Sequence, residues 1–185
     1  MSAEHKKRVV LHDKTFEESI SYERINGAIE NVAERINSDY RGVETPLFLG
    51  VLNGAFMFMS ELMQKIEFPC ELSFVKLSSY SGTASTGKVS ELIGLRNNIE
   101  GRHVIIVEDI VDTGTSMLHL LRSLEGHRPA SVSIATLLFK PSSFHQDYEV
   151  KYRAMDIPND FIVGFGLDYD ELGRNLKDIY TVVDE

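Results

Sequence analysis

The chain has very little cysteine, no long apolar run and a shortage of basic residues. Cys70 is the only cysteine, so no internal disulfide can form, and a reducing compartment fits this composition. Residues 1–8 are followed by only three apolar residues, too few for a signal-peptide core. No apolar run approaches the about 20 residues that span a bilayer. These absences predict a cytoplasmic protein with no membrane partner.

Basic residues are outnumbered, 19 Lys plus Arg against 28 Asp plus Glu, which gives a formal net charge of -9. A nucleic-acid backbone would be repelled by this balance, so we expect no nucleic-acid partner. Small anionic substrates remain compatible with it if they arrive with Mg²⁺. The 185 residues carry no internal repeat and no Pro-rich linker, and they predict a single domain over 1–185.

Apolar patterning predicts strands that alternate with helices. Ile25, Ile29, Val32 and Ile36 recur at helical spacing and predict an amphipathic helix over 21–39. The other expected helices cover 55–66 and 116–124, and the expected strands cover 46–52, 72–77, 89–95, 103–107, 131–139 and 161–167. This order is typical of an α/β fold with a mostly parallel twisted sheet flanked by helices.

Charged residues follow several of these strands. In such sheets ligands bind beyond the carboxyl ends of the strands. We therefore expect one shared edge for Glu108, Asp109, Lys140 and Asp168.

Residues 104–116 are the most informative stretch. An apolar strand is followed by the adjacent carboxylates Glu108 and Asp109, and Asp112 then opens a turn rich in Thr, Gly and Ser. Such acids can hold sugar hydroxyls or Mg²⁺, while backbone N–H groups at a helix start suit a phosphate. A ribose 5-phosphate has both parts. The simpler alternative, a helix cap at Asp112 or Thr113, needs only one such residue.

Three other motifs are missing from this stretch. Gly114 has no partner glycine and Lys-Ser/Thr for a Walker P-loop, and there is no Gly-x-Gly-x-x-Gly dinucleotide fingerprint. Aspartyl phosphatases use Asp-x-Asp, whereas Asp109 and Asp112 are three residues apart. A separate segment, 78–88, is rich in Ser, Thr and Gly and predicts a mobile loop.

Residues 108–116 resemble the phosphoribosyl pyrophosphate signature of type I phosphoribosyltransferases. The resemblance to the hypoxanthine/guanine branch covers almost the whole chain and adds, in order, Leu52-Asn53-Gly54, Ser79-Tyr80, Lys140, Phe161-Ile162-Val163-Gly164, Leu167-Asp168-Tyr169 and Arg174. It implies a core over about 40–168 and a small hood from the N-terminal segment and about 140–185. It also implies transfer of 5-phosphoribosyl to N9 of hypoxanthine and guanine, giving IMP or GMP and pyrophosphate in purine salvage.

On the donor side, the resemblance implies that Glu108 and Asp109 hold the ribose hydroxyls and a Mg²⁺ ion. Asp168 would ligate a second Mg²⁺, and Arg174 would meet the leaving pyrophosphate. Backbone amides at Asn53-Gly54 would also face pyrophosphate, through the non-proline cis bond that members of this family often have. The 5′-phosphate would be wrapped by Asp112, Thr113, Gly114, Thr115 and Ser116.

On the purine side, the resemblance makes Asp112 the general base near N7 and Lys140 the donor to the 6-oxo group. Phe161 would stack on the purine, the main chain at Ile162 would read its edge, and Asp168 would lie close by. The loop with Ser79 and Tyr80 would close over the site. Family members also suggest a homodimer or homotetramer.

Two positions depart from relatives. Asn53 and Thr115 each stand where some members carry a basic residue, which bears on pyrophosphate affinity. Two other functions stay open: a phosphoribosyl-sensing regulator of transcription or RNA, which should show a basic face, and an acidic-pocket receiver domain, whose acidic pair lies near the first strand. The choice among hypoxanthine, guanine and xanthine is also open.

Overall fold

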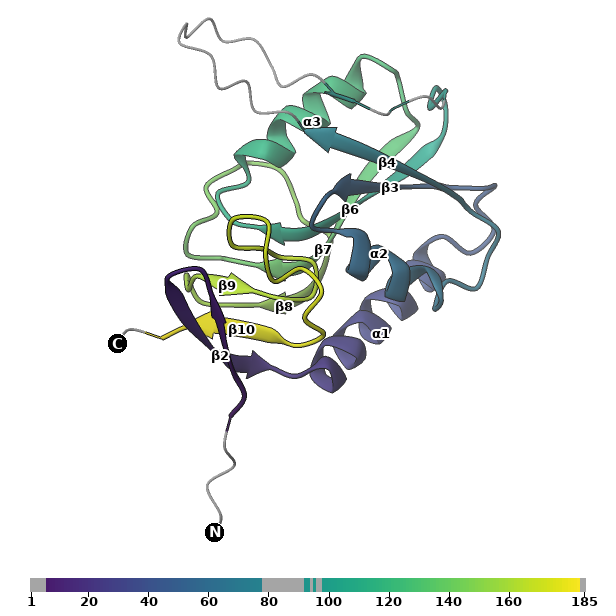
Figure 1. Cartoon of the computed structure of the whole chain (residues 1–185). Helices are drawn as coiled ribbons and strands as arrows, with labels where there is room; N and C mark the ends of the chain where they lie inside the picture. Colours follow the sequence, from purple (N-terminus) through teal and green to yellow (C-terminus); the bar gives the residue numbers. More distant parts are fainter. Residues whose placement is uncertain (1–5, 78–91, 94, 96–97, 184–185) are drawn as a thin grey trace, which may run out of the picture.

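The structure is a computed structural model that describes residues 6–77, 92–93, 95 and 98–183. Its larger sheet has six strands in the order β5-β4-β3-β6-β7-β8 (Figure 1). Neighbouring strands from β4 to β8 run parallel, and β5 pairs antiparallel with β4. The bounds are β3 Leu47–Leu52, β4 Glu71–Leu77, β5 Leu92–Ile93, β6 His103–Val111, β7 Ser131–Phe139 and β8 Tyr152–Asp156. The predicted α/β fold with a mostly parallel sheet is confirmed.

Helices cover both faces of this sheet. Helices α1 (Tyr22–Asp39) and α2 (Phe56–Met63) lie on one face, and α3 (Thr115–Glu125) lies on the other (Figure 1). Side chains alternate across a strand, so in β6 Ile105 and Val107 point toward α1 and α2. Val104 and Ile106 point toward α3. A strand segment buried on both faces is mostly apolar, which is why β3 and residues 104–107 of β6 form continuous apolar runs.

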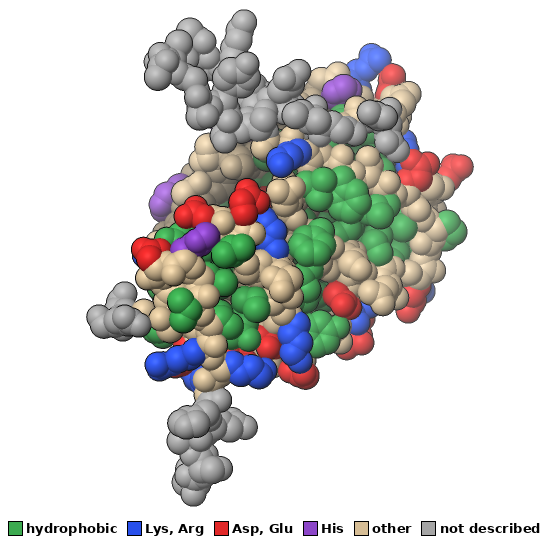
Figure 2. Space-filling view, in the orientation of Figure 1, with side chains coloured by type: hydrophobic (Ala, Val, Ile, Leu, Met, Phe, Trp, Pro, Cys, Tyr) green, Lys and Arg blue, Asp and Glu red, His purple; other side chains and the backbone are tan. Residues whose placement is uncertain are grey.

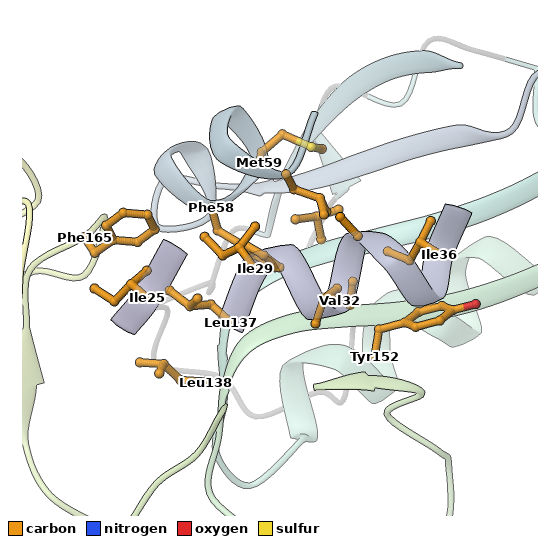
Figure 3. Packing of buried hydrophobic residues seen from close by; sticks show 14 of the residues in the cluster. Ile25, Ile29, Val32, Ile36, Phe58, Met59, Leu137, Leu138, Tyr152 and Phe165 are labelled. Carbon is orange, nitrogen blue, oxygen red and sulfur yellow. The ribbon is translucent and has the colours of Figure 1, made fainter. Parts of the chain in front are cut away.

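Helix α1 forms where its apolar spacing predicts it. Ser21 caps the helix by accepting a hydrogen bond from the Arg24 N–H, and the apolar face packs on the sheet and α2 (Figure 3). Buried on that face are Ile25, Ile29, Val32, Ala33 and Ile36. Helix α2 is shorter than expected and ends at Met63. In the part of the chain that the structure describes, no helix is long and apolar enough to cross a membrane.

The two ends of the chain build a second, antiparallel sheet. Its order is β1-β2-β10-β9, with bounds Arg8–Leu11, Lys14–Ile20, Ile179–Val182 and Ile162–Val163 (Figure 1). Asp178, next to β10, links this sheet to the start of α1, since its carboxylate accepts hydrogen bonds from the Tyr22 N–H at 2.8 Å and from Lys7 Nζ at 3.2 Å.

Two expected strand ends were wrong. The strand predicted over 161–167 is only Ile162–Val163, because Gly164, Phe165 and Gly166 all have positive φ and turn the chain. This strand also belongs to the small sheet, so Asp168 does not lie at the carboxyl end of a parallel strand. The strand predicted over 103–107 instead continues to Val111, because its pairing with β7 persists past the two acids.

Candidate functional site

The acidic stretch folds into the end of β6, a tight turn and the start of α3. Gly114 is the N-cap residue of α3 and adopts the left-handed conformation, with φ 77°, which a glycine reaches without steric cost. The turn borders a pocket of about 110 Å³. The pocket is lined by Glu108, Ile110, Val111, Asp112, Thr113, Gly114, Thr115, Ser116 and Met117.

Glu108 has a buried carboxyl oxygen with no hydrogen-bond partner among the described residues. Among the described residues, its Oε2 is the buried side-chain atom for which the structure offers no hydrogen bond. Burial, with the Asp109 carboxylate as a second cause, raises the pKa of Glu108 well above its usual value. An unpaired buried carboxylate oxygen is costly, so a hydroxyl or cation at this position would stabilise it.

Asp109 lies where three segments meet. Burial raises the pKa of its carboxyl to about 6, although the Ile110 N–H donates to Oδ1 at 2.8 Å and opposes this rise. A Cβ atom on Gly54 would overlap the Asp109 carboxylate, and a Cβ atom on Gly166 would overlap the Gly54 carbonyl oxygen. Both glycines therefore allow the β3–α2 connection to lie directly between β6 and the loop after β9. That connection contains a non-proline cis peptide, Leu52-Asn53.

Asp112 and Lys140 form an ion pair, with Nζ 3.2 Å from Oδ2. Val111 of β6 and Phe139 of β7 are register partners, so the next residue along each strand stands side by side. The Lys140 ammonium is almost fully buried, whereas the Asp112 carboxylate is 45% exposed. The pair thus presents a carboxylate and an ammonium together, next to the pocket.

Asp168 and Arg174 come from the loop after β9. Arg174 Nη2 lies 2.6 Å from Asp168 Oδ1, and the other Asp168 oxygen accepts a hydrogen bond from the Glu171 N–H. Arg174 also donates to the Gly166 carbonyl at 2.8 Å, which ties the loop to its own start. Arg174 lowers the pKa of Asp109 and Asp168 raises it, though both effects are smaller than that of burial. The loop is therefore close enough to the sheet edge to act on Asp109.

Phe161 and Ile162 lie on the small sheet. The Phe161 ring is 43% exposed and packs at 5.8 Å from the Phe16 ring and edge-on at 5.5 Å from the Tyr169 ring. Ile162 is buried and pairs with Thr181 of β10. An aromatic ring with one open side and firm support on the other can accept a flat ligand.

A family model, the phosphoribosyl transferase domain, matches residues 21–170. The chain belongs to this family. Curated relatives named hypoxanthine-guanine phosphoribosyltransferase include one from Mycobacterium tuberculosis, 41% identical over 169 residues that cover 88% of this chain and 84% of the relative. Another, from Streptococcus thermophilus, is 43% identical over 166 residues and covers 89% and 92%.

Solved phosphoribosyltransferases share the fold. A hypoxanthine-guanine phosphoribosyltransferase from Bacillus anthracis is 36% identical and superposes with a TM-score of 0.80, covering 90% of this chain and 98% of the other. The hypoxanthine phosphoribosyltransferase of Trypanosoma cruzi is 34% identical, with a TM-score of 0.81 and coverages of 91% and 97%. The resemblance inferred from residues 108–116 is confirmed.

Not every expected residue of this phosphoribosyltransferase can be placed. Ser79 and Tyr80 lie outside the described residues. Within the described ranges, no group of three or more His, Cys, Asp or Glu side chains is arranged to hold a metal ion. Glu108, Asp109 and Asp168 therefore do not form one protein cage, and any Mg²⁺ here has to take other ligands from substrate and water.

The sequence interpretation overlooked a group of side chains in the loop over 141–150. Tyr148 donates a hydrogen bond to the Gly114 carbonyl at 2.7 Å, and Gln146 donates to the Thr113 carbonyl at 3.1 Å. Two aromatic residues, Phe144 and Tyr148, within an otherwise polar loop were the available signal. Their contact with the turn depends on long-range packing, which the local pattern does not reveal.

Proposed function

We propose that this chain transfers the 5-phosphoribosyl group from phosphoribosyl pyrophosphate to N9 of hypoxanthine and guanine, releasing pyrophosphate, as a step of purine salvage. The observation that carries the proposal is the Asp112–Lys140 ion pair beside the pocket that the turn over 112–116 lines. The names of the relatives support the same substrate class. With a single cysteine and no internal disulfide, the chain suits the cytoplasm, where we propose that it works.

Asp112 would act as the general base. As N9 attacks the ribose carbon, positive charge and a labile proton develop on the purine, and a half-exposed carboxylate near N7 can accept that proton. Lys140 would donate to the 6-oxo group. An ammonium has no acceptor to offer the 6-amino group of adenine, so this residue would favour oxopurines.

Glu108, Asp109 and the turn would hold the donor. The orphaned Glu108 Oε2 fits a ribose hydroxyl or a cation, and Thr113, Gly114, Thr115 and Ser116 border the pocket that would take the 5′-phosphate. Backbone amides at Asn53-Gly54 and the guanidinium of Arg174 would meet pyrophosphate.

The carboxylates Glu108, Asp109 and Asp168 fit Mg²⁺, which is commonly held by one or two protein carboxylates together with substrate oxygens. Bound there, Mg²⁺ would neutralise the charge of the departing pyrophosphate. The family match does not itself specify the ion, so we support this assignment with the oxygen-only donor set and with the unpartnered Glu108 oxygen.

The small sheet would form the hood over the purine. Phe161 would stack on the base with its open side, and the main chain at Ile162 would read the purine edge. Its tie to the core at Asp178 would let the hood and the sheet edge enclose one substrate.

We also propose that the chain forms a homodimer or homotetramer. Figure 2 shows apolar side chains gathered over the region of α2 and β4, and the exposed apolar residues include Leu52, Phe56 and Leu72. Exposed apolar surface of this kind often marks a protein interface. Sedimentation equilibrium of the chain and of Phe56→Glu would test this, since a monomer at all concentrations contradicts it.

The activity test is direct. The purified chain is incubated with phosphoribosyl pyrophosphate, Mg²⁺ and one purine at a time, and nucleotides are separated by chromatography. We expect IMP from hypoxanthine, GMP from guanine and no AMP from adenine. Absence of a nucleoside monophosphate from every oxopurine would refute the proposal.

A further inference from the structure

Three side chains of the loop over 141–150 pack against the turn over 112–116. A Cβ atom built on Gly114 would lie 2.5 Å from the Tyr148 hydroxyl, 2.7 Å from the Phe144 ring and 2.8 Å from Gln146 Cγ. The Phe144 ring itself packs 5.1 Å from Phe139 and edge-on at 5.3 Å from Tyr148. None of the three side chains is among the residues that line the pocket.

Hydrogen bonds from this loop hold two successive carbonyl groups of the turn. The Tyr148 hydroxyl donates to the Gly114 oxygen at 2.7 Å, which also accepts the first helical bond from the Leu118 N–H at 3.0 Å. Gln146 Nε2 donates to the Thr113 oxygen at 3.1 Å. Burial and the Glu108 carboxyl raise the pKa of Tyr148 to about 12, so its hydroxyl keeps its proton at neutral pH.

When a carbonyl group is held in this way, the orientation of the N–H of the next residue is fixed as well. In a trans peptide the C=O and the following N–H point in opposite directions within one plane. The Thr113 carbonyl is in the same plane as the Gly114 N–H, and the Gly114 carbonyl is in the same plane as the Thr115 N–H. Both amides therefore point away from Gln146 and Tyr148. Gly114 and Thr115 line the pocket, whereas Gln146 and Tyr148 do not.

We propose that Tyr148 and Gln146 are positioning residues that aim the Gly114 and Thr115 amides at the 5′-phosphate of the donor. The inference rests on the phosphate position proposed above. Among the described residues, the Thr115 N–H donates to Thr113 Oγ1 at 3.4 Å, a long hydrogen bond that a phosphate oxygen can replace. The two residues thus act on the phosphate without touching it.

This role predicts a selective defect. Ligands with a 5′-phosphate, namely phosphoribosyl pyrophosphate and IMP, depend on the aimed amides. Pyrophosphate and the free purine would bind at Arg174 and Lys140, away from them. A loop that merely stabilised the fold would affect all four ligands alike.

The test compares Tyr148→Phe, Gln146→Ala and the double variant with Tyr152→Phe. Tyr152 is a matched control, because its hydroxyl donates a hydrogen bond of 2.8 Å to Asp39 and the residue does not line the pocket. Steady-state kinetics give kcat and both KM values, and calorimetry gives the dissociation constants of IMP and pyrophosphate. Calorimetry needs no turnover, so binding is measured even if transfer fails.

Each single loop variant should raise the KM for phosphoribosyl pyrophosphate and the Kd for IMP by about 3- to 10-fold, the effect of one neutral hydrogen bond. The kcat, the KM for hypoxanthine and the Kd for pyrophosphate should stay unchanged, and Tyr152→Phe should lower thermal stability without changing any of them. Unchanged IMP binding in both loop variants, or equal loss for every ligand, would overturn the inference.

Thr113→Ala and Ser116→Ala separate the two levels of the argument. If they weaken IMP while the loop variants do not, the phosphate site stands and the positioning role is wrong. If neither set weakens IMP binding, the phosphate does not bind at this turn. The proposed phosphate position and the positioning role then both fail, while the transfer reaction is still judged by the activity test.

Discussion

The carboxyl edge of the parallel sheet holds Asp112 and Lys140, whereas the loop beyond β9 holds Asp168 and Arg174. At the edge, the β6–β7 ladder brings the two side chains together before any side-chain contact is made. In the loop, positive-φ residues and the Asp168–Arg174 ion pair do the positioning, and both charges are about a quarter exposed. The positions of the charged side chains at the edge thus depend on backbone pairing, and those in the loop depend on turn conformation and side-chain contacts. We expect the edge to carry the chemistry and the loop to tune binding.

The largest effect should come from the edge. Asp112→Asn keeps the size of the side chain but removes the base, so kcat with hypoxanthine should fall about 10²- to 10⁴-fold. The KM for phosphoribosyl pyrophosphate should change little, because the turn and its amides remain. Initial-rate kinetics over both substrates measure this. An unchanged kcat would show that Asp112 is not the base, and would contradict the expectation that the edge carries the chemistry while the loop tunes binding.

Lys140→Met should give the next largest effect. It keeps much of the apolar stem and removes the ammonium that pairs with Asp112. A hydrogen bond to a charged group contributes about 1.5–3 kcal/mol, so the KM for hypoxanthine should rise roughly 10- to 150-fold. Competition by adenine is the control. If adenine still fails to compete while hypoxanthine binds normally, Lys140 does not select the 6-oxo group.

Gly166→Ala tests whether the loop depends on close backbone approach. The new Cβ would meet the Gly54 carbonyl, and φ of 99° is unfavourable for alanine, so stability should fall by about 1–3 kcal/mol. Urea unfolding measures the change. Gly27→Ala is the matched control: it lies in α1 with nothing within 4 Å of the new atom, and should gain about 0.5–1 kcal/mol. Equal losses in both variants would contradict the close approach.

Asp178→Asn tests the link between the small sheet and the start of α1. Burial raises the pKa of Asp178, but the Tyr22 N–H and Lys7 outweigh it, so the net pKa is lowered. A lowered carboxyl pKa contributes stability above the unfolded value of about 3.9, and this contribution is lost as pH falls through the folded pKa. The variant should therefore be about 1.5–3 kcal/mol less stable than the parent at pH 7.

Urea unfolding at pH 7 and at about pH 3 provides the check on Asp178. The difference between the parent and Asp178→Asn should shrink at the lower pH, because the carboxyl of the unfolded parent then gains its proton and the advantage of the lowered folded pKa declines. A difference that grows as pH falls would show that the Asp178 charge does not hold the small sheet to α1.

Local pattern was sufficient for most of the larger sheet. Helix α1 and strands β3, β4 and β7 form where the apolar spacing predicts them. The reason is that an element buried on one face or on both faces needs apolar residues at a regular spacing, which is visible in the sequence. The resemblance placed Asp112 and Lys140 on the same purine, but their ion pair was not predicted, because the expected strand ended at 107 and not at Val111. Strands β1, β2, β8 and β10 were not predicted either, because their mixed sequences lack a strong period.

The sequence alone was enough to indicate the family of this protein: the acids at 108 and 109, the turn over 112–116 and their likeness to a phosphoribosyl pyrophosphate signature are local features. Tertiary structure decided which residues face them. The close approach of Gly54 to Asp109, of Gly166 to Gly54 and of Tyr148 to Gly114 joins segments far apart along the chain. A one-dimensional pattern records the period of burial but not the partner, because a contact exists only once the chain has folded back on itself.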